Sequence, residues 1–387
     1  MAALGIRKGA TPALHSQVGR LTALLPSIEL ARDELRHQGP TLDEKTIHRM
    51  TRQLGAEVLA TRTRDLQRYR DGRLPAGQEM AGQRVVAQMD GGRVRIRTQV
   101  ETKKRKGVKY RRKIRVEWRE PKVLILYLSD GKGRLLRGTR PWIDGTMNGS
   151  DHLMELLAFH LHRLGAAQAK MVSFVSDGAP WIWNRLDWVV KRVGLDAKRT
   201  ERILDCCHAA HHISLALQAL GLPDEERTAT YRTLRQQLRA GRSRDVVATL
   251  RTMAEGQPPD SGVWVEIEYL NKHEPHLRYD WFAYRGRPLG SGAVESAIRR
   301  VINLRLKGNG IYWREENAEA MLVLRAAALT GRWEETMERT QASMARDRRR
   351  DWHWAAPDME AELKSDAVIK PPMAQPESSE QSEAIAA

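Results

Sequence analysis

The sequence predicts an α/β protein with a mixed sheet flanked by helices, an all-α insertion and a helical N-terminal region. Extended runs between residues 84 and 145 suggest antiparallel strands, and strand and helix patterns then alternate. A polar, mostly helical stretch interrupts this alternation after residue 220. We expect these parts: a helical region 1–78, core 79–212, insertion 213–285, core completion 286–345, and a basic then acidic, disordered tail 346–387.

The N-terminal region shows helical periodicity over residues 14–70. A first segment ends at Gly39 and Pro40, and a second resumes with Thr41 as the expected N-cap and Glu44 three residues later. Two helices around a short turn resemble a helix-turn-helix, and an ordinary helical hairpin fits the pattern equally well.

The core begins after a turn-rich linker over residues 71–78. An apolar run from residue 84 ends at Asp90, and the stretch VLILYL at 123–128 is apolar enough for a central strand. A buried strand pattern at 169–178 ends at Asp177, and a helix pattern, a short strand and another helix follow. The strand and helix alternation predicts a sheet covered on both faces.

Charge and cysteine content narrow the functional class. The net charge is +17, which favours a polyanionic partner, most often nucleic acid. The only cysteines, Cys206 and Cys207, are adjacent, so no disulfide framework is expected and a reducing cytoplasm fits. The N-terminus lacks the apolar core of a signal peptide, and no apolar run is long enough to span a bilayer. We therefore expect a soluble intracellular protein with no membrane partner.

Three acids stand at the ends or starts of rigid elements. Asp90 and Asp177 close two apolar strand patterns and precede glycines, and Glu295 begins a helix pattern after Gly290-Ser291-Gly292. We expect glycines at these points to leave room for something to approach the backbone. Three converging carboxylates would repel one another unless cations held them, and magnesium prefers such oxygen ligands. Two magnesium ions can activate an attacking oxygen and stabilise a leaving oxygen at phosphorus.

Each acid also has an ordinary explanation. Asp-Gly is a common turn dipeptide, which would account for Asp90 and Asp177. Glu295 suits a helix N-terminus by roughly 0.3–1 kcal/mol and could pair with Arg299. The order of two strand-ending Asp residues and one helix-starting Glu on a basic chain favours the functional hypothesis.

These residues carry a family resemblance. The blocks VVAQMDGGRVRIR, VSDGAPWIWN and PLGSGAVESAIRRVINLRLKGNGIYW resemble the catalytic core of DDE transposases, over residues 80–335. The Glu block, with AEAMLVLRAAALTGRW after it, is similar to insertion-sequence transposases of the ISKra/ISLre type within the Mutator-like group. The resemblance implies an RNase H-like core with a helical insertion before the Glu, and it implies catalytic, metal-binding roles for Asp90, Asp177 and Glu295.

A further motif follows the second Asp. Asp205-Cys206-Cys207-His208 matches a signature of Mutator-like enzymes, which implies that Asp205 and His208 support the active site. A zinc site made by Cys206, Cys207, His208, His211 and His212 is an alternative. Adjacent cysteines rarely bind one ion, so packing and surface roles are favoured for the other members. Trp181 and Trp183 fit either helix packing or stacking on a displaced base.

Basic residues cluster in two places. The first is KKRKGVKYRRK at 103–113, expected to be a hairpin tip against the DNA backbone. The second is the polar side of the Glu295 helix, opposite an expected buried stripe of Val294, Ile298, Val301 and Leu304. The alternative for the first cluster is a disordered turn without a partner. For Arg305 and Lys307 in the second cluster, the alternative is solvated surface charge. The expected DNA-binding residues are Lys103, Lys104, Arg105, Lys106, Arg111, Arg112, Lys113, Arg299, Arg300, Arg305 and Lys307.

The residues predict metal-assisted phosphoryl transfer with Mg²⁺, or Mn²⁺ as a substitute. The resemblance implies a transposase that cleaves DNA strands and joins them. The expected partners are double-stranded insertion-sequence ends and target DNA, bound by a homo-oligomer at the nucleoid of a bacterial cytoplasm. An inactive, transposase-derived DNA-binding protein and an RNase H-like nuclease without strand transfer are the alternatives. No cysteine precedes Cys206, whereas related transposases often carry a cysteine-rich, zinc-binding N-terminal segment. End recognition would then rest on the helices of residues 14–70.

Overall fold

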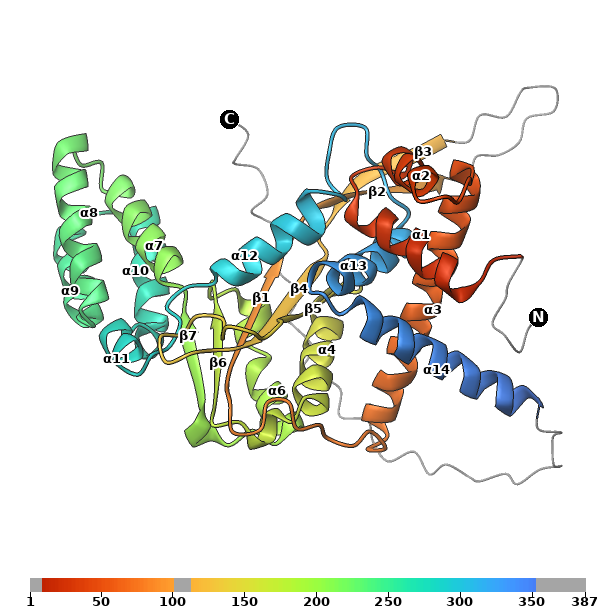
Figure 1. Cartoon of the computed structure of the whole chain (residues 1–387). Helices are drawn as coiled ribbons and strands as arrows, with labels where there is room; N and C mark the ends of the chain where they lie inside the picture. The colour runs from red at the N-terminus through yellow and green to blue at the C-terminus, as the bar shows by residue number, and fades with distance from the viewer. Residues whose placement is uncertain (1–8, 101–112, 353–387) are drawn as a thin grey trace.

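A five-stranded mixed sheet lies at the centre of the molecule, in the order β5-β4-β1-β6-β7 (Figure 1). The computed structural model describes residues 9–100 and 113–352. In the sheet, β4 is antiparallel to β1 and to β5, whereas β6 runs parallel to β1 and β7 parallel to β6. This sheet, flanked by helices, is compatible with an RNase H-like fold. The strands are β1 (Arg84–Gly91), β4 (Lys122–Leu128), β5 (Trp142–Thr146), β6 (Met171–Ser176) and β7 (Thr200–Leu204).

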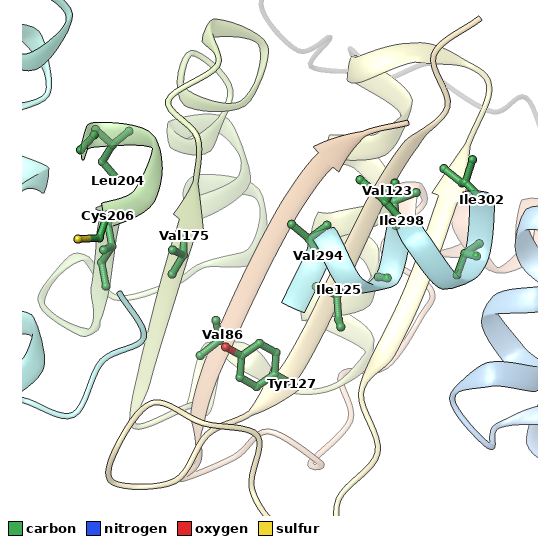
Figure 2. Close-up of a cluster of buried hydrophobic side chains, with 14 of the residues drawn as sticks. Val86, Val123, Ile125, Tyr127, Val175, Leu204, Cys206, Val294, Ile298 and Ile302 are labelled. Atoms are coloured by element: carbon green, nitrogen blue, oxygen red, sulfur yellow. The ribbon is translucent and has the colours of Figure 1, made fainter. Parts of the chain in front are cut away.

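Helices cover both faces of the sheet, and each face has its own hydrophobic core. Because side chains alternate along a strand, Val85 and Met89 of β1 pack on one face and Val86 on the other. The first face lies against α4 (Gly149–Arg163) and α6 (Leu186–Val193). The second lies against α12 (Gly292–Ile298) and α13 (Glu315–Leu329). Figure 2 shows Val294 and Ile298 of α12 above Val123 and Ile125 of β4.

The N-terminal helices are built into the core. They are α1 (Pro12–Leu24), α2 (Ile28–His37) and α3 (Glu44–Arg70). The N-cap of α3 is Asp43, whose carboxylate accepts a hydrogen bond from the Thr46 N–H at 2.8 Å, so the prediction of Thr41 was wrong. α3 packs along α13 and along α14 (Trp333–Trp352). The helix-turn-helix interpretation stays a prediction.

A buried charge network fixes α3 to the sheet. The guanidinium of Arg62 in α3 pairs with Asp144 of β5 at 2.8 Å and also with Glu319 of α13. His160 of α4 contacts the second oxygen of Asp144 at 2.9 Å. The network therefore joins the N-terminal helices to the same sheet that carries the candidate site.

The expected insertion is a helical unit at the end of the molecule opposite α1–α3 (Figure 1). α10 packs on α7, and α8 packs on α7 and α9. The boundary expected at 212/213 falls inside α7, because one helix runs without a break from the sheet edge into the unit. The unit comprises α7 (Cys206–Ala219), α8 (Asp224–Arg239), α9 (Ser243–Met253), α10 (Gly262–Lys272), η3 (Glu274–His276) and α11 (Tyr279–Tyr284).

A separate two-stranded ribbon of β2 (Val94–Val100) and β3 (Lys113–Arg119) extends from the end of β1. Its expected tip lies outside the described residues, as do the candidate DNA contacts Lys103, Lys104, Arg105, Lys106, Arg111 and Arg112. Lys113 is the first residue of β3. At the other end of the chain, α14 continues to Trp352, so the expected tail boundary at residue 346 falls within a helix, and residues 353–387 lie outside the described part.

The remaining elements are short. Across residues 9–100 and 113–352, none of the helices has the length and apolarity needed to cross a membrane. The short elements are η1 (Ala166–Gln168), α5 (Pro180–Trp183), η2 (Ala197–Arg199) and η4 (Arg299–Asn303), the last of which is a π-helix that continues α12.

Candidate active site at the carboxyl ends of β1 and β6

The two candidate aspartates stand at the ends of neighbouring parallel strands. The pairing of β1 with β6 aligns Gln88 with Val175. Extending this register by two residues aligns Asp90 with Asp177, and alternation along the strands places both on the sheet face that α12 covers. Residues far apart in the sequence therefore meet at one sheet edge.

A buried glutamine holds the start of α12 over this edge. The side chain of Gln88 is fully buried and makes two hydrogen bonds of 3.0 Å. Its amide donates to the carbonyl of Gly290, and its oxygen accepts from the Val294 N–H. Gln88 precedes Asp90 by two residues, and Val294 adjoins Glu295, so this clamp fixes the helix that carries the Glu to the strand that carries the Asp.

Asp205 forms a second clamp from the end of β7. Its carboxylate is buried, with 1% exposure, and one oxygen caps α7 by accepting from the N–H groups of Cys207 at 2.6 Å and His208 at 2.9 Å. The other oxygen accepts from the Ser291 hydroxyl at 2.6 Å and from the Ser291 N–H. Asp205 thus ties α7 to the turn before α12. The contact between Asp205 and His208 is made through the backbone N–H of His208. The charge of the His208 side chain acts to lower the pKa of Asp90.

Asp177 and Glu295 both act electrostatically on Asp90. Burial, opposed by a hydrogen bond from the Gly91 N–H, raises the pKa of Asp90 to about 6, and the charges of Asp177 and Glu295 raise this pKa further. The charge of His208 acts in the opposite direction. Among the described residues no lysine or arginine forms an ion pair with any of the three acids. Within the described residues the three acids are therefore neighbouring carboxylates that no lysine or arginine pairs with.

The donor set has the chemistry that hard divalent cations prefer, namely carboxylate oxygens of which some face solvent. Asp90 and Asp177 are half-buried and Glu295 is exposed. Over the described residues, no group of three His, Cys, Asp or Glu side chains is already gathered as metal ligands, the three acids included. The residue types fit magnesium, and binding one ion with all three acids requires their carboxylates to draw closer together.

The insertion reaches the site through Tyr269 of α10. The Tyr269 hydroxyl donates a 2.6 Å hydrogen bond to the carbonyl of Asp177. The Tyr269 ring stacks on His212, with 3.5 Å between ring centroids, and His212 contacts Glu266 at 2.5 Å. Gly178 has φ +81°, and a Cβ there would lie 2.3 Å from the Tyr269 hydroxyl. Only glycine fits between the second aspartate and this tyrosine.

The glycines after Asp90 serve packing within the protein. A Cβ on Gly91 would lie 1.9 Å from Glu120, and one on Gly92 would lie 2.4 Å from Ile302. At these two positions the expectation of free space beside the backbone was wrong, because side chains of the chain itself fill it.

The helix that carries Glu295 changes its period after Ile298. The Leu304 N–H bonds to the Arg299 carbonyl five residues back, as in a π-helix. The wider turn shifts the buried face, so Ile302 is fully buried and Leu304 is 59% exposed, contrary to the predicted stripe.

Of the candidate DNA-binding cations near Glu295, Arg299 and Lys307 are exposed and Arg300 is half-buried. Arg305 is only 6% exposed, and its guanidinium lies 5.2 Å from the centroid of the Trp313 ring. Arg305 is therefore corrected to a packing residue, because its charge faces the interior.

An open cavity of about 670 Å³ lies beside Glu295. Its lining includes Asp205, Cys207 and Glu295, together with Lys132 and Arg134 from the β4–β5 loop, and Arg134 also pairs with Asp130 at 3.3 Å. The cavity combines one exposed acid of the site with two exposed cations, which suits a phosphate-bearing ligand.

The His and Cys residues after β7 do not form a zinc site among the described residues. Cys206 is a buried free thiol and Cys207 an exposed one.

Trp181 and Trp183, the two candidates for base stacking, are both engaged in packing contacts. The ring of Trp181 lies 4.3 Å from the Lys122 ammonium, and that of Trp183 lies 4.5 Å from His276.

Sequence reasoning missed Gln88 and Tyr269. A polar residue inside the apolar run RVVAQM was the signal for Gln88, since a buried amide needs hydrogen-bond partners. No local signal marked Tyr269, because its contact spans 92 positions in the chain.

Comparisons with known proteins were made by family, sequence and structure. No protein-family model matches the chain, and no curated protein matches its sequence. Among solved structures the chain is similar to the Drosophila P element transposase strand transfer complex, with 12% sequence identity and a TM-score of 0.26. The alignment covers 86% of this chain and 82% of that chain. A likeness of that size does not assign the chain to a family.

Proposed function

We propose that the protein is a metal-dependent DNA-processing enzyme of the DDE transposase type. The observation that carries this proposal is that Asp90 and Asp177 end two adjacent parallel strands on the sheet face that α12 covers, and α12 carries Glu295. None of the three acids forms an ion pair among the described residues. Maintaining such a group is unfavourable unless the group serves a cationic ligand. Functional sites are where perturbed carboxylates of this kind concentrate.

In this proposal Asp90 and Asp177 hold Mg²⁺, or Mn²⁺ in its place, and Glu295 completes the ligand set. When bound, two such ions supply activation of an attacking oxygen and stabilisation of a leaving oxygen at phosphorus. Asp90 must lose its proton to bind a cation, and burial raises its pKa to about 6, so we expect cation binding to weaken as the pH falls through that range. Gln88 and Asp205 hold α12 in place while the Glu295 side chain closes on the ligand.

The DNA strand is held by the cations around the acids. Arg299 at the start of η4 and Lys307 in the chain after η4 are exposed, and both can contact phosphates beside the scissile bond. Lys132 and Arg134 face the cavity next to Glu295 and can contact a phosphate on the other side of it. The acids then act on a phosphodiester that the cations have oriented.

Strand transfer is the finer part of the proposal. In that step a 3′-hydroxyl released by cleavage attacks a second duplex. The order Asp, Asp, Glu and the Glu block that resembles insertion-sequence transposases support it. Binding of two DNA segments at once, by a homo-oligomer on insertion-sequence ends and target DNA, belongs to the same proposal.

The test uses the full-length chain and the DNA that flanks its own coding sequence. A labelled duplex of that DNA is incubated with MgCl₂ or MnCl₂, together with a supercoiled plasmid as target. We expect metal-dependent nicking and joined products, both abolished by Asp90→Asn and unaffected by Asp187→Asn, a carboxylate of α6 that is 76% exposed and pairs with Arg202. Undiminished cleavage by the Asp90 variant would refute the assignment.

A pre-cut end with a free 3′-hydroxyl separates the two enzymatic alternatives. Joining of that end to the plasmid identifies a transposase, whereas cleavage without joining identifies a nuclease. DNA binding that needs no divalent ion and is never followed by nicking would leave a binding protein with structural acids.

A further inference from the structure

One face of the β2–β3 ribbon combines apolar side chains with arginines in an exposed position. The register pairs Arg95 with Trp118 and Arg97 with Val116. Directly opposite residues share a face of an antiparallel pair, so these four side chains lie together. Trp118 is 55% exposed and Val116 46% exposed, an unusual state for large apolar groups in a ribbon.

The same face continues at both ends. Toward the expected tip, Ile114 is 56% exposed and pairs with Gln99. Beside Arg95, the chain after α12 adds Tyr312, which is 41% exposed. We define the ribbon face by Arg95, Arg97, Ile114, Val116, Trp118 and Tyr312.

Three flat groups lie in a row on this face. The Arg95 guanidinium carbon lies 5.5 Å from the centroid of the Trp118 ring and 4.8 Å from that of the Tyr312 ring. The backbone of the neighbouring Trp313 holds the chain next to β2. The backbone N–H of Trp313 donates to the Arg95 carbonyl at 3.0 Å, and the Trp313 carbonyl accepts from the Arg97 N–H at 2.8 Å. Aromatic rings interleaved with arginine are the groups on which unpaired nucleic-acid bases stack.

The ribbon is anchored at the candidate site. Its first strand starts four residues after Asp90, and the Gly92 N–H donates to the Pro121 carbonyl at 2.9 Å. Val94 and Ile96, on the opposite face of the ribbon, are buried in the core. A strand held on the ribbon face is therefore led toward the three acids by a rigid support.

The charge of the face selects its occupant. Glu117 pairs with Ile96, which places this acid on the buried side of the ribbon. In the described part of the ribbon, the exposed face thus carries cations and no acid. Packing against a second copy of the chain would set arginine against arginine, whereas a nucleic-acid strand offers phosphates to the arginines and bases to the rings.

We propose that the ribbon face binds an unpaired stretch of DNA by stacking bases on Trp118 and Tyr312. The proposal rests on the proposed function, since it makes the unpaired strand a neighbour of the cleavage site. A blunt duplex hides its base faces, so the ribbon face contributes to binding only where the strands separate.

The test measures binding apart from chemistry. Fluorescence anisotropy follows the full-length Asp90→Asn protein in EDTA with labelled DNA, either a blunt duplex or the same duplex with a single-stranded overhang. Trp118→Ala and Tyr312→Ala should each weaken overhang binding about tenfold and change blunt binding less than about twofold. Tyr284→Ala, at the most exposed of the large apolar residues with 89% exposure, is the matched control and should change neither.

An abasic overhang and the conservative substitution Trp118→Phe test whether stacking on the ring causes the loss of binding. An overhang of abasic sites should bind the parent protein as weakly as an intact overhang binds Trp118→Ala, and Trp118→Phe should restore most of the loss. Equal losses on blunt and overhang DNA, or no loss, would overturn the proposal. A lower molecular mass in solution for Trp118→Ala with unchanged overhang binding would show a contact between copies instead. Because neither metal nor cleavage enters the assay, its failure leaves the cleavage test unaffected.

Discussion

Replacing Asp90 by Asn should stabilise the metal-free protein at pH 7.5. Burial, with the charges of Asp177 and Glu295 adding to it, raises the pKa of Asp90 from 3.8 to about 6. The folded state therefore holds this proton more tightly than the unfolded chain does, and stability is lost as the pH rises from about 4 to about 6. Above that window the ionised carboxylate opposes folding.

The magnitude follows from the same shift. About two pKa units correspond to about 3 kcal/mol, and screening of this half-buried carboxyl by solvent reduces the value to about 1–2 kcal/mol. In the parent, the Gly91 N–H donates a hydrogen bond of 2.6 Å to the Asp90 carboxylate. The amide oxygen of Asn can accept the same hydrogen bond, so the substitution does not remove it. For a chain of 387 residues this corresponds to a rise in Tm of roughly 1–3 °C.

Differential scanning fluorimetry in EDTA between pH 4 and pH 8 measures this change. The Tm difference between variant and parent should vanish near pH 4 and be full above pH 7, and Asp187→Asn should show neither effect. MgCl₂ should then raise the Tm of the parent and not that of Asp90→Asn, since a ligand at 100 times its Kd adds about 2.7 kcal/mol. A less stable variant at pH 7.5, or equal stabilisation of both proteins by MgCl₂, would refute the reasoning.

Three further substitutions probe the supports of the site. Gln88→Met should destabilise the protein by about 2–4 kcal/mol in urea unfolding, because the Val294 N–H of α12 and the Gly290 carbonyl before α12 lose their partner. An unchanged midpoint would exclude the clamp. Gly178→Ala should cost about 1–3 kcal/mol, and Tyr269→Phe in the same chain should recover part of it by removing the clashing hydroxyl; strict additivity would contradict the contact. Arg62→Ala should cost about 3–5 kcal/mol. Burial acts to raise the pKa of Asp144, but the Arg62 charge outweighs burial and keeps this pKa below its usual range. The parent should therefore lose the stability contributed by the pair as the pH falls below about 4. A stability difference between parent and variant that does not change with pH would count against the pair.

Much of the core could be predicted because local patterns and burial agree there. The apolar runs of β4 and β6 are buried throughout, as their composition predicts for central strands. The alternation after residue 146 produces the parallel part of the sheet. The strand–acid order was also visible, because Asp90 and Asp177 follow apolar runs directly.

What could not be predicted depends on contacts between distant segments. Arg305 has the same local pattern as the exposed Lys307, and only packing against Trp313 and α1 buries it. The exposure of Leu304 follows from a π-turn, which a helical period of 3.6 residues does not anticipate. Thr41 and Asp43 are both good N-cap residues, and the structure alone selects Asp43.

The glycines illustrate the same limit at the site. Their presence beside the acids was correctly seen, and their purpose was not. Gly92 lies under Ile302 and Gly178 under Tyr269, and both neighbours come from segments more than 90 positions away along the chain. A single sequence shows that a position is small without showing what approaches it.

Diffraction from crystals of the full-length protein soaked in MnCl₂ tests the central claim most directly. We predict an anomalous manganese peak at the ends of β1 and β6, with oxygens of Asp90, Asp177 and Glu295 about 2.0–2.3 Å from the ion. Manganese bound only elsewhere, or a Glu295 side chain that stays turned away from two metal-bound aspartates, would contradict the assignment of the three acids to one metal centre.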